Sequence, residues 1–438
     1  MKKKLLKIIS SKEFLIFFIS LIIITSSIQL RYGDPMMSRI MTVRSIVEHR
    51  TLDINTVPDY FSIDKICRDS ECYSTKPPLL TIIGAGFYFI YYNLLNLKFY
   101  SLTYYLLTFS TIGIFFSLIL FFFYRTMGWF KIDTAKKLLF TLSLGFGTLL
   151  FTYSVNFSNH ILSALLTFLS FITILKIELG ETSKKYIALV GFLTSLIFIN
   201  EVLQGLIISI TFFIYLLLKD STRKYFYLYI LASLPAIIFY IFYNLQITGN
   251  VFPAYLNEKL YHYPGGYWMN PNGIDALSHS KPVYFFNLIF GTHGILVYSP
   301  ILFFGAWGLI KTIKDKRSVL RNPAILVATT CLLILITLTF LTNNYGGSSY
   351  GFRWFILCYP MLFFFVIALS GKLTHKLFAR TYITVLLFSI FFAYIGFIII
   401  FPWYDFTFLG HLIYFPLLDQ LGGFLYYILT FIHNFILA

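Results

Sequence analysis

The sequence has little charge for its length. Only 12% of its 438 residues are Asp, Glu, Lys or Arg, whereas 58% are hydrophobic. Soluble domains carry about 25% charged residues, so this composition excludes an ordinary soluble protein. Many apolar runs of about 20 residues instead predict a polytopic membrane protein.

Two further absences narrow the architecture. Runs such as residues 115–123 do not alternate between apolar and polar side chains, which argues against a transmembrane β-barrel. An all-α fold follows, because each backbone polar group in lipid must find its partner within its own segment. The sequence shows no linker, soluble domain or repeat. We therefore expect one membrane domain over residues 1–438, with about 11 to 13 transmembrane helices.

Acidic residues are scarce compared with basic ones. The chain has 18 Asp and Glu against 34 Lys and Arg, a net charge of +16. Basic residues of membrane proteins cluster in cytoplasmic loops, so we expect membrane lipids as partners and no nucleic acid. The clusters are Lys2 to Lys7, Arg125 to Lys137, Lys176 to Lys185, Lys219 to Lys224, Lys311 to Arg321 and Lys372 to Arg380.

Placing these clusters inside predicts a topology in the cell (inner) membrane. The apolar segment Phe14–Leu30 is longer than a usual signal-peptide core, so we interpret it as a retained first span with a cytoplasmic N-terminus. The remaining polar segments then lie on the external, periplasmic side. They are Arg31–Pro77, Asn156–Asn159, the region around Asn200–Gln204, Ile247–Phe290, Thr342–Arg353 and Pro402–Gly422.

One conflict remains in this topology. Pro78–Leu97 and Ser101–Tyr124 are both apolar, and two full passes would return the chain to the external side at Arg125. Either one of these segments is not a simple pass, or the basic stretch after it breaks the charge rule.

The four cysteines fall into two pairs. Cys331 and Cys358 lie in apolar spans, where packing is the simplest role. Cys67 and Cys72 lie in the polar loop, and an external location would allow a disulfide between them. A metal site there is disfavoured, because no second Cys/His pair lies nearby.

The first polar loop, Arg31–Pro77, holds seven of the 18 acids and leads into Lys76-Pro77-Pro78. Other unusual polar residues also fall on the predicted external side, which favours one functional face. Charged groups at membrane depth are costly and are candidates for function, although any single one can snorkel or lie in water. The set comprises Asp34, Lys76, His160, Glu201, His262 and Arg353.

Three segments around these residues have alternative interpretations. Glu201 lies in an apolar stretch, Tyr186–Leu218, that is long for one span and short for two; it is either the tip of a broken hairpin or a buried core residue. Tyr261–Trp268 suits either sugar stacking or an interfacial aromatic belt. Asn343–Trp354, with Tyr345 as a site-lining residue, combines glycines that allow close ligand approach with an arginine suited to phosphate, or forms an interfacial anchor.

Several motifs together resemble a known family. They are Gly33-Asp34, the helical stretch Ser38–Glu48, Lys76-Pro77-Pro78-Leu79, Phe146–Ser154 followed by Asn159-His160, Gly291–Pro300 and Gly346–Trp354. Their order resembles the GT-C superfamily of glycosyltransferases, in particular bacterial relatives of protein O-mannosyltransferases and lipid A aminoarabinose transferases. The resemblance covers most of the chain up to about Gly371.

The resemblance implies transfer of a sugar from a polyprenyl-phosphate-linked donor to an acceptor hydroxyl of a lipid, glycan or protein on the external face. Asp34 matches the catalytic aspartate, which would act as general base. Lys76 matches the lysine that holds the lipid phosphate, and Arg353 and Arg39 are further candidates for phosphate contacts. Cys67 and Cys72 would brace the loop between Asp34 and Lys76.

The chain also departs from the family pattern. Many relatives carry Asp-Glu at the catalytic position and an acid before Lys-Pro-Pro, where this chain has Pro35 and Thr75. We therefore assign no cofactor, while His160 and Glu201 remain residues that could bind a divalent metal. Asp34 could instead be a helix N-cap, and Lys76 an interfacial lysine before a Pro-led helix. The competing functions are a polysaccharide polymerase or ligase and a lipid-linked sugar transporter.

Overall fold

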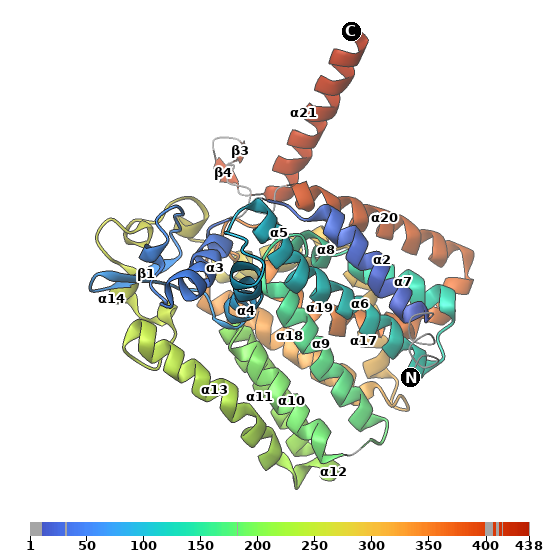
Figure 1. The fold of residues 1–438 in the computed structure, drawn as a ribbon. Coiled ribbons are helices and arrows are strands. Elements are labelled where there is room, and N and C mark those ends of the chain that lie inside the picture. Colours follow the sequence, from blue (N-terminus) through green and yellow to red (C-terminus); the bar gives the residue numbers. More distant parts are fainter. Residues whose placement is uncertain are drawn as a thin grey trace. The chain divides into compact units, whose positions relative to one another are not determined.

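The computed structural model describes residues 11–30, 33–181, 183–398, 406–408, 411–413 and 415–437 (Figure 1). It is 74% helical, and within these residues the only strands form two short hairpins, which confirms the all-α prediction. Three of the segments used for the topology fall partly or wholly outside the described residues. They are the cluster Lys2 to Lys7, the start of the loop at Arg31, and residues 402–405, 409, 410 and 414 of the last loop.

The chain divides into two compact units, each made of two stretches. The first unit comprises residues 1–122 and 154–271, and the second comprises residues 123–153 and 272–438. The assignment of residues 1–438 to one membrane domain stays a prediction.

The first unit contains the first loop and a helical bundle. Its early elements are α2 (Lys12–Ser27), α3 (Asp34–Arg44), the π-helix η1 (Ser45–His49), the 3₁₀ helix η2 (Ile54–Thr56), β1 (Lys65–Arg68), β2 (Glu71–Ser74), α4 (Leu79–Asn93), α5 (Ser101–Thr108), the π-helix η3 (Phe109–Gly113) and the part of α6 (Ile114–Met127) up to Phe122. Its later elements are α9 (Asn159–Glu178), α10 (Lys184–Phe198), α11 (Val202–Leu218), α12 (Asp220–Arg223), α13 (Phe226–Thr248), η5 (Ala254–Leu256), α14 (Glu258–Tyr261) and η6 (Tyr267–Met269).

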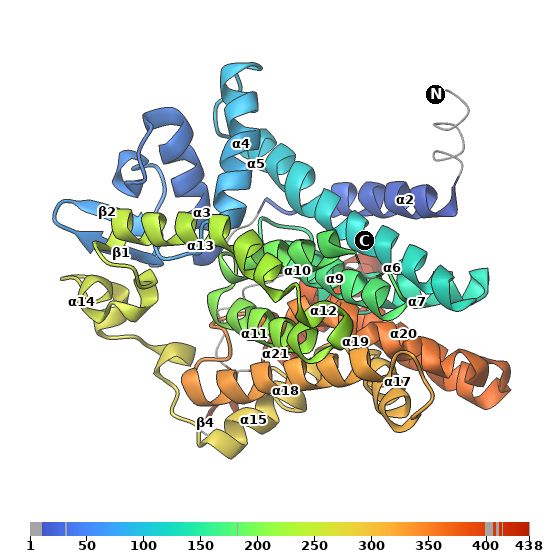
Figure 2. The same cartoon turned by 90° about the horizontal axis from the view of Figure 1, so that it is seen from below.

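Helix α10 organises the bundle of the first unit. It packs against α9, α11 and α13, which run beside it in both views (Figures 1 and 2). Gly191 makes the contact with α13 close, since a Cβ there would lie 2.3 Å from the Tyr229 carbonyl oxygen. The short turn after Phe198 then leads into α11, so residues 186–218 form the broken hairpin that was one of the two interpretations.

The first loop folds onto this bundle. Strands β1 and β2 pair antiparallel, and a disulfide joins Cys67 to Cys72 across them. Ile66 and Tyr73 of the hairpin pack into one buried cluster with Ile199 and with Tyr240 of α13. The loop is therefore an ordered structure with its own apolar contacts, which hold its polar residues in place.

The second unit is built around buried helical segments near the end of the chain. Its elements are η4 (Gly128–Phe130), α7 (Thr134–Phe146), α8 (Leu149–Tyr153), η7 (Gly273–Ala276), α15 (Lys281–Ile289), α16 (Ile295–Tyr298), α17 (Leu302–Lys314), α18 (Arg321–Leu341), η8 (Arg353–Cys358), α19 (Tyr359–Phe364), η9 (Phe365–Thr374), α20 (Lys376–Ile398), β3 (Phe406–Phe408), β4 (His411–Ile413) and α21 (Pro416–Leu437). Helix α17 packs on η9, α18 and α19, while α20 packs on α7, α8 and η9.

Six helical segments in the described chain are long and apolar enough to cross a membrane. They are Ser101–Phe130, Asn159–Glu178, Phe226–Thr248, Arg321–Leu341, Arg353–Thr374 and Lys376–Phe397. The chain is thus a membrane protein, and the count of about 11 to 13 spans stays a prediction.

The length of helix α4 is relevant to the conflict over whether Pro78–Leu97 and Ser101–Tyr124 both cross the membrane. The helix has 15 residues, which at 1.5 Å per residue is about 22 Å, whereas the hydrocarbon core of a bilayer is about 30 Å thick. The next segment, Ser101–Phe130, is one helical run of 30 residues and is ample for a pass. The lengths favour the interpretation that Pro78–Leu97 is not a simple pass.

Candidate active site

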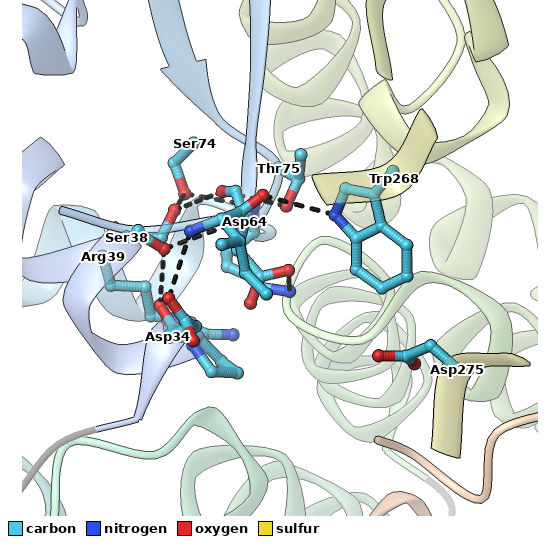
Figure 3. Close-up of polar contacts among 12 residues, drawn as sticks. Asp34, Ser38, Arg39, Asp64, Ser74, Thr75, Trp268 and Asp275 are labelled. Atoms are coloured by element: carbon cyan, nitrogen blue, oxygen red, sulfur yellow. Dashed lines mark hydrogen bonds and ion pairs between the residues drawn. The ribbon is translucent and has the colours of Figure 1, made fainter. Parts of the chain in front are cut away.

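Asp34 is the first residue of α3, directly before Pro35. Its Oδ1 accepts a hydrogen bond from the Ile63 backbone N–H at 3.1 Å, and its carbonyl oxygen accepts one from the Ser62 hydroxyl at 3.0 Å (Figure 3). The N-cap of α3 is Gly33, with no side-chain cap. The alternative that Asp34 is merely the N-cap is therefore wrong, since its carboxylate bonds across the loop.

The surroundings of Asp34 favour its neutral form. Burial raises the pKa of this carboxyl above its usual value of 3.8, and the neighbouring Asp64 raises it further. The Ile63 N–H and the Lys76 ammonium oppose this rise in pKa without cancelling it. A carboxylate that binds protons more tightly than a free aspartate is a stronger base, which suits proton abstraction from a hydroxyl.

Lys76 forms an ion pair with Asp64. Its Nζ lies 2.7 Å from Asp64 Oδ1, and the two side chains are 20% and 8% exposed. Asp64 is held in turn by its backbone, because its carbonyl oxygen accepts from Ser38 Oγ at 2.7 Å and from the Thr75 N–H at 3.2 Å. Lys76 is thus held in the loop by a buried partner. A lysine that only anchors a helix at the membrane interface would need no such partner.

Asp64 is a site residue that the sequence analysis did not single out. The hairpin pairs Cys67 with Cys72 and Lys65 with Ser74, so Asp64 comes opposite Thr75. Thr75 stands where the resemblance leads one to expect an acid before Lys-Pro-Pro, and Asp64 places a carboxylate beside Lys76 from across the hairpin. The spacing of the two cysteines, interpreted as a hairpin register, would have indicated this partner.

A hydrogen-bond network fixes the rest of this loop. Ser38 Oγ and Ser74 Oγ are 2.6 Å apart, and the indole Nε1 of Trp268 donates to the Ile63 carbonyl at 3.3 Å (Figure 3). Arg39 is buried one turn beyond Asp34 and donates from Nη1 to the Pro35 carbonyl at 2.9 Å. Its expected contact with a donor phosphate stays a prediction.

His160 and Glu201, 41 residues apart, come together in the first unit. His160 Nδ1 lies 2.8 Å from Glu201 Oε1, and Asn159 Nδ2 donates to the same oxygen at 3.4 Å. Asn200 completes the cluster by donating to the Asn159 carbonyl and to Ser163 Oγ. Glu201 is 5% exposed, and its Oε2 has no hydrogen-bond partner among the described residues.

Removal of the imidazole should destabilise this cluster. We expect His160→Phe, which keeps a ring of similar size, to lower the free energy of unfolding by about 2 to 3 kcal/mol, because it removes a partner of a buried carboxylate. Adding Glu201→Met should recover much of that loss. The exposed His375, changed to Phe, is the control. Thermal unfolding in one detergent measures all four proteins, and an unchanged melting temperature for His160→Phe would contradict a stabilising contact between His160 and Glu201.

The remaining candidates show different settings. His262 is exposed in the segment after α14 of the first unit. Tyr345 is buried in the second unit, with its ring stacked between His293 at 4.8 Å and Tyr284 at 4.2 Å. Its hydroxyl is 2.6 Å from His279 Nδ1. A ring so enclosed offers no face for stacking, and the site-lining role of Tyr345 stays a prediction.

Arg353 begins η8 in the second unit and lies under the turn that follows Tyr345. A Cβ at Gly346 would be 3.5 Å from Arg353 Cγ and Nε, and Gly346 and Gly347 have φ angles of +93° and +80°. Only glycine adopts these angles without strain, so the two glycines let the backbone cover the arginine. Gly346 therefore lies against Arg353 within the second unit, and the phosphate contact expected of Arg353 stays a prediction.

Few side chains that could bind a metal ion lie close together. The described residues hold no group of three or more His, Cys, Asp or Glu side chains suited to one ion. His160 and Glu201 supply two such side chains. Metal binding there stays an untested expectation.

Comparison with known proteins shows the fold. No protein-family model and no curated protein matches the chain. ArnT from Cupriavidus metallidurans in the apo state matches with a TM-score of 0.52 and 12% identity, over 85% of this chain and 61% of that one. The archaeal oligosaccharyltransferase AglB from Archaeoglobus fulgidus, in complex with an inhibitory peptide and a dolichol-phosphate, matches with a TM-score of 0.52 and 12% identity. The apo form of the Archaeoglobus fulgidus oligosaccharyltransferase matches with a TM-score of 0.53 and 13% identity.

The chain thus has the fold of GT-C membrane glycosyltransferases, as the motifs predicted. The match to AglB covers 88% of this chain but only 55% of the AglB chain. The match to the apo oligosaccharyltransferase covers 89% of this chain and 56% of that one. The chain spans less than two thirds of the length of these structures. At 12 to 13% identity the likeness establishes the fold, and the chemistry must be argued from the site.

Proposed function

We propose that this protein transfers a sugar from a polyprenyl-phosphate-linked donor to a hydroxyl group of a lipid, glycan or protein acceptor. The observation that carries the proposal is Asp34, a buried carboxyl with a raised pKa, next to the Lys76–Asp64 ion pair. These groups supply a base for an acceptor hydroxyl and a cation for a departing phosphate. The proposed location is the external face of the inner membrane, with the N-terminus in the cytoplasm.

The shared fold supports a lipid phosphate as one ligand. One of the matching structures, AglB, contains a dolichol-phosphate together with an inhibitory peptide. A lipid-linked phosphate and a second substrate meeting in one membrane protein are what the proposed reaction needs.

The proposed reaction is a single displacement. The acceptor oxygen attacks the anomeric carbon, and its proton passes to the Asp34 carboxylate. The bond between that carbon and the phosphate oxygen breaks, and the electron pair leaves with the polyprenyl phosphate. Lys76 stabilises the charge that grows on the phosphate. An ammonium has three N–H donors, so Lys76 can hold Asp64 and a phosphate oxygen together.

The pH dependence of the reaction tests the base. Asp34 acts only when ionised, so kcat/KM should fall as the pH drops through its pKa, which lies above the ordinary 3.8. Asp64→Asn removes a negative neighbour that raises this pKa. We expect it to move the acidic limb to lower pH, measured as polyprenyl phosphate released from a lipid-linked sugar. Asp69→Asn, in the hairpin turn, is the control; an acidic limb that Asp64→Asn leaves in place would contradict the assignment.

A further inference from the structure

A groove in the first unit lies apart from the proposed base. It has a volume of about 560 Å³, and its walls are the end of the α3–η1 helix, the start of α4 and the second half of α13. This volume falls within the range of roughly 300–1,000 Å³ that is usual for small-molecule sites. The proposed reaction assigns no role to this groove.

The lining of the groove combines apolar and polar side chains. Ile82 of α4 and Phe239 and Phe242 of α13 are among the apolar ones, and all three are exposed, Phe242 by 66%. Helix α13 is a candidate span whose most apolar stretch is only 28% buried, so this face meets lipid. Arg50, Thr51 and Gln246 add polar side chains to the lining. The groove therefore offers both kinds of surface that an amphiphile contacts.

Among the described residues that line the groove, Arg50 is the only charged one. It ends η1 with a φ of +56°, its side chain is exposed, and the described residues offer its guanidinium no hydrogen bond or ion pair. The nearby carboxylates are engaged elsewhere. Glu48 binds Arg44 and the Tyr88 hydroxyl, and Asp53 accepts from the backbone N–H groups of Asn55 and Cys72. An unneutralised guanidinium in a groove with exposed apolar side chains favours an anionic headgroup.

Arg50 lies away from Asp34, just beyond the far end of the same helical run. The helical run from Asp34 to His49 places Arg50 about 20 Å along the axis from Asp34. Lys76, the proposed phosphate contact, does not line the groove. A donor whose phosphate lies at Lys76 would leave Arg50 unneutralised, so the groove suits a second amphiphile.

We propose that this groove binds an anionic phospholipid of the bilayer. The headgroup phosphate lies on the Arg50 guanidinium, with Thr51 and Gln246 beside it. An acyl chain crosses Phe239, Phe242 and Ile82. The bound lipid would fill the space between the first loop and α13 and so support the loop that carries Asp34 and Lys76.

The test is native mass spectrometry of the full-length protein, titrated with phosphatidylglycerol and separately with phosphatidylcholine. We expect wild type to bind phosphatidylglycerol more tightly, and Arg50→Gln to weaken that binding about fivefold while leaving phosphatidylcholine unchanged. Phe242→Gln should weaken both lipids. Lys98→Gln, which removes an exposed charge of the same unit outside the groove, should match wild type.

Three results would overturn the proposal. They are equal phosphatidylglycerol binding by Arg50→Gln and wild type, an equal loss in Lys98→Gln, and displacement of phosphatidylglycerol by polyprenyl phosphate, which would assign the groove to the donor. The outcome is independent of the proposed reaction, because Asp34→Asn should bind phosphatidylglycerol as wild type does.

Discussion

Asp34→Asn should fold as well as wild type and lose nearly all transfer activity. The amide keeps an oxygen that can accept from the Ile63 N–H, so the link across the loop survives. It cannot take a proton from a hydroxyl, and general-base catalysis contributes about 10²- to 10⁴-fold. We therefore expect kcat to fall by about 10²-fold or more, measured as release of polyprenyl phosphate from a lipid-linked sugar.

The stability of Asp34→Asn shows whether its loss of activity comes from the missing base or from unfolding. Because folding raises the pKa of Asp34, its ionised form costs stability at pH values above both the unfolded and the folded pKa. Asn removes that charge, so the melting temperature at neutral pH should stay the same or rise. Asp69→Asn is the matched control, since Asp69 is exposed in the hairpin turn at a φ of +58°, which Asn tolerates. Wild-type turnover by Asp34→Asn on a confirmed donor would refute the assigned base.

Lys76→Gln should lose both donor binding and stability. Its ammonium lies 2.7 Å from Asp64, and removing it leaves a carboxylate that is 8% exposed without its cation. We expect the free energy of unfolding to fall by about 2 to 3 kcal/mol. Loss of a fixed cation at the leaving phosphate should lower kcat/KM by about 10²-fold.

The double variant separates these two effects. Adding Asp64→Asn to Lys76→Gln removes the stranded carboxylate, so stability should recover while kcat/KM stays low. Lys65→Gln, a lysine of the same hairpin, is the control. Unfolding is followed by intrinsic fluorescence, and kcat/KM by the release assay. If the double variant regains activity along with stability, Lys76 is a structural residue and makes no phosphate contact.

Much of the fold could be predicted from local patterns in the sequence. Apolar run lengths predict an all-helical membrane protein, because lipid leaves a backbone little choice. For Glu201, a run too long for one span gave a broken hairpin as one of two interpretations, and the structure shows both the hairpin and a buried Glu201. The length of α4 could not be predicted in this way, because the apolar run Pro78–Leu97 does not show that its helix ends at Asn93.

Long-range partners explain what the sequence analysis missed at the site. Asp34 and Lys76 lie in recognisable motifs, but Asp64 is one of seven acids in its loop, and only the strand register places it beside Lys76. His160 and Glu201 were singled out separately. Their contact depends on how α9 packs against the α10–α11 turn, which no local pattern encodes. The stack that encloses Tyr345 likewise joins it to Tyr284 and His293 from an earlier part of the chain.

The most direct test of the proposed reaction is its stoichiometry. The lipid-linked sugar that co-purifies with the protein is identified by mass spectrometry and offered to wild-type protein in vesicles. Polyprenyl phosphate and the new glycoside are then both counted. The proposal predicts one polyprenyl phosphate released for each sugar joined to the acceptor, and neither product with Asp34→Asn. Movement of the intact lipid-linked sugar across the vesicle membrane, with no bond cleaved, would contradict it and identify a transporter.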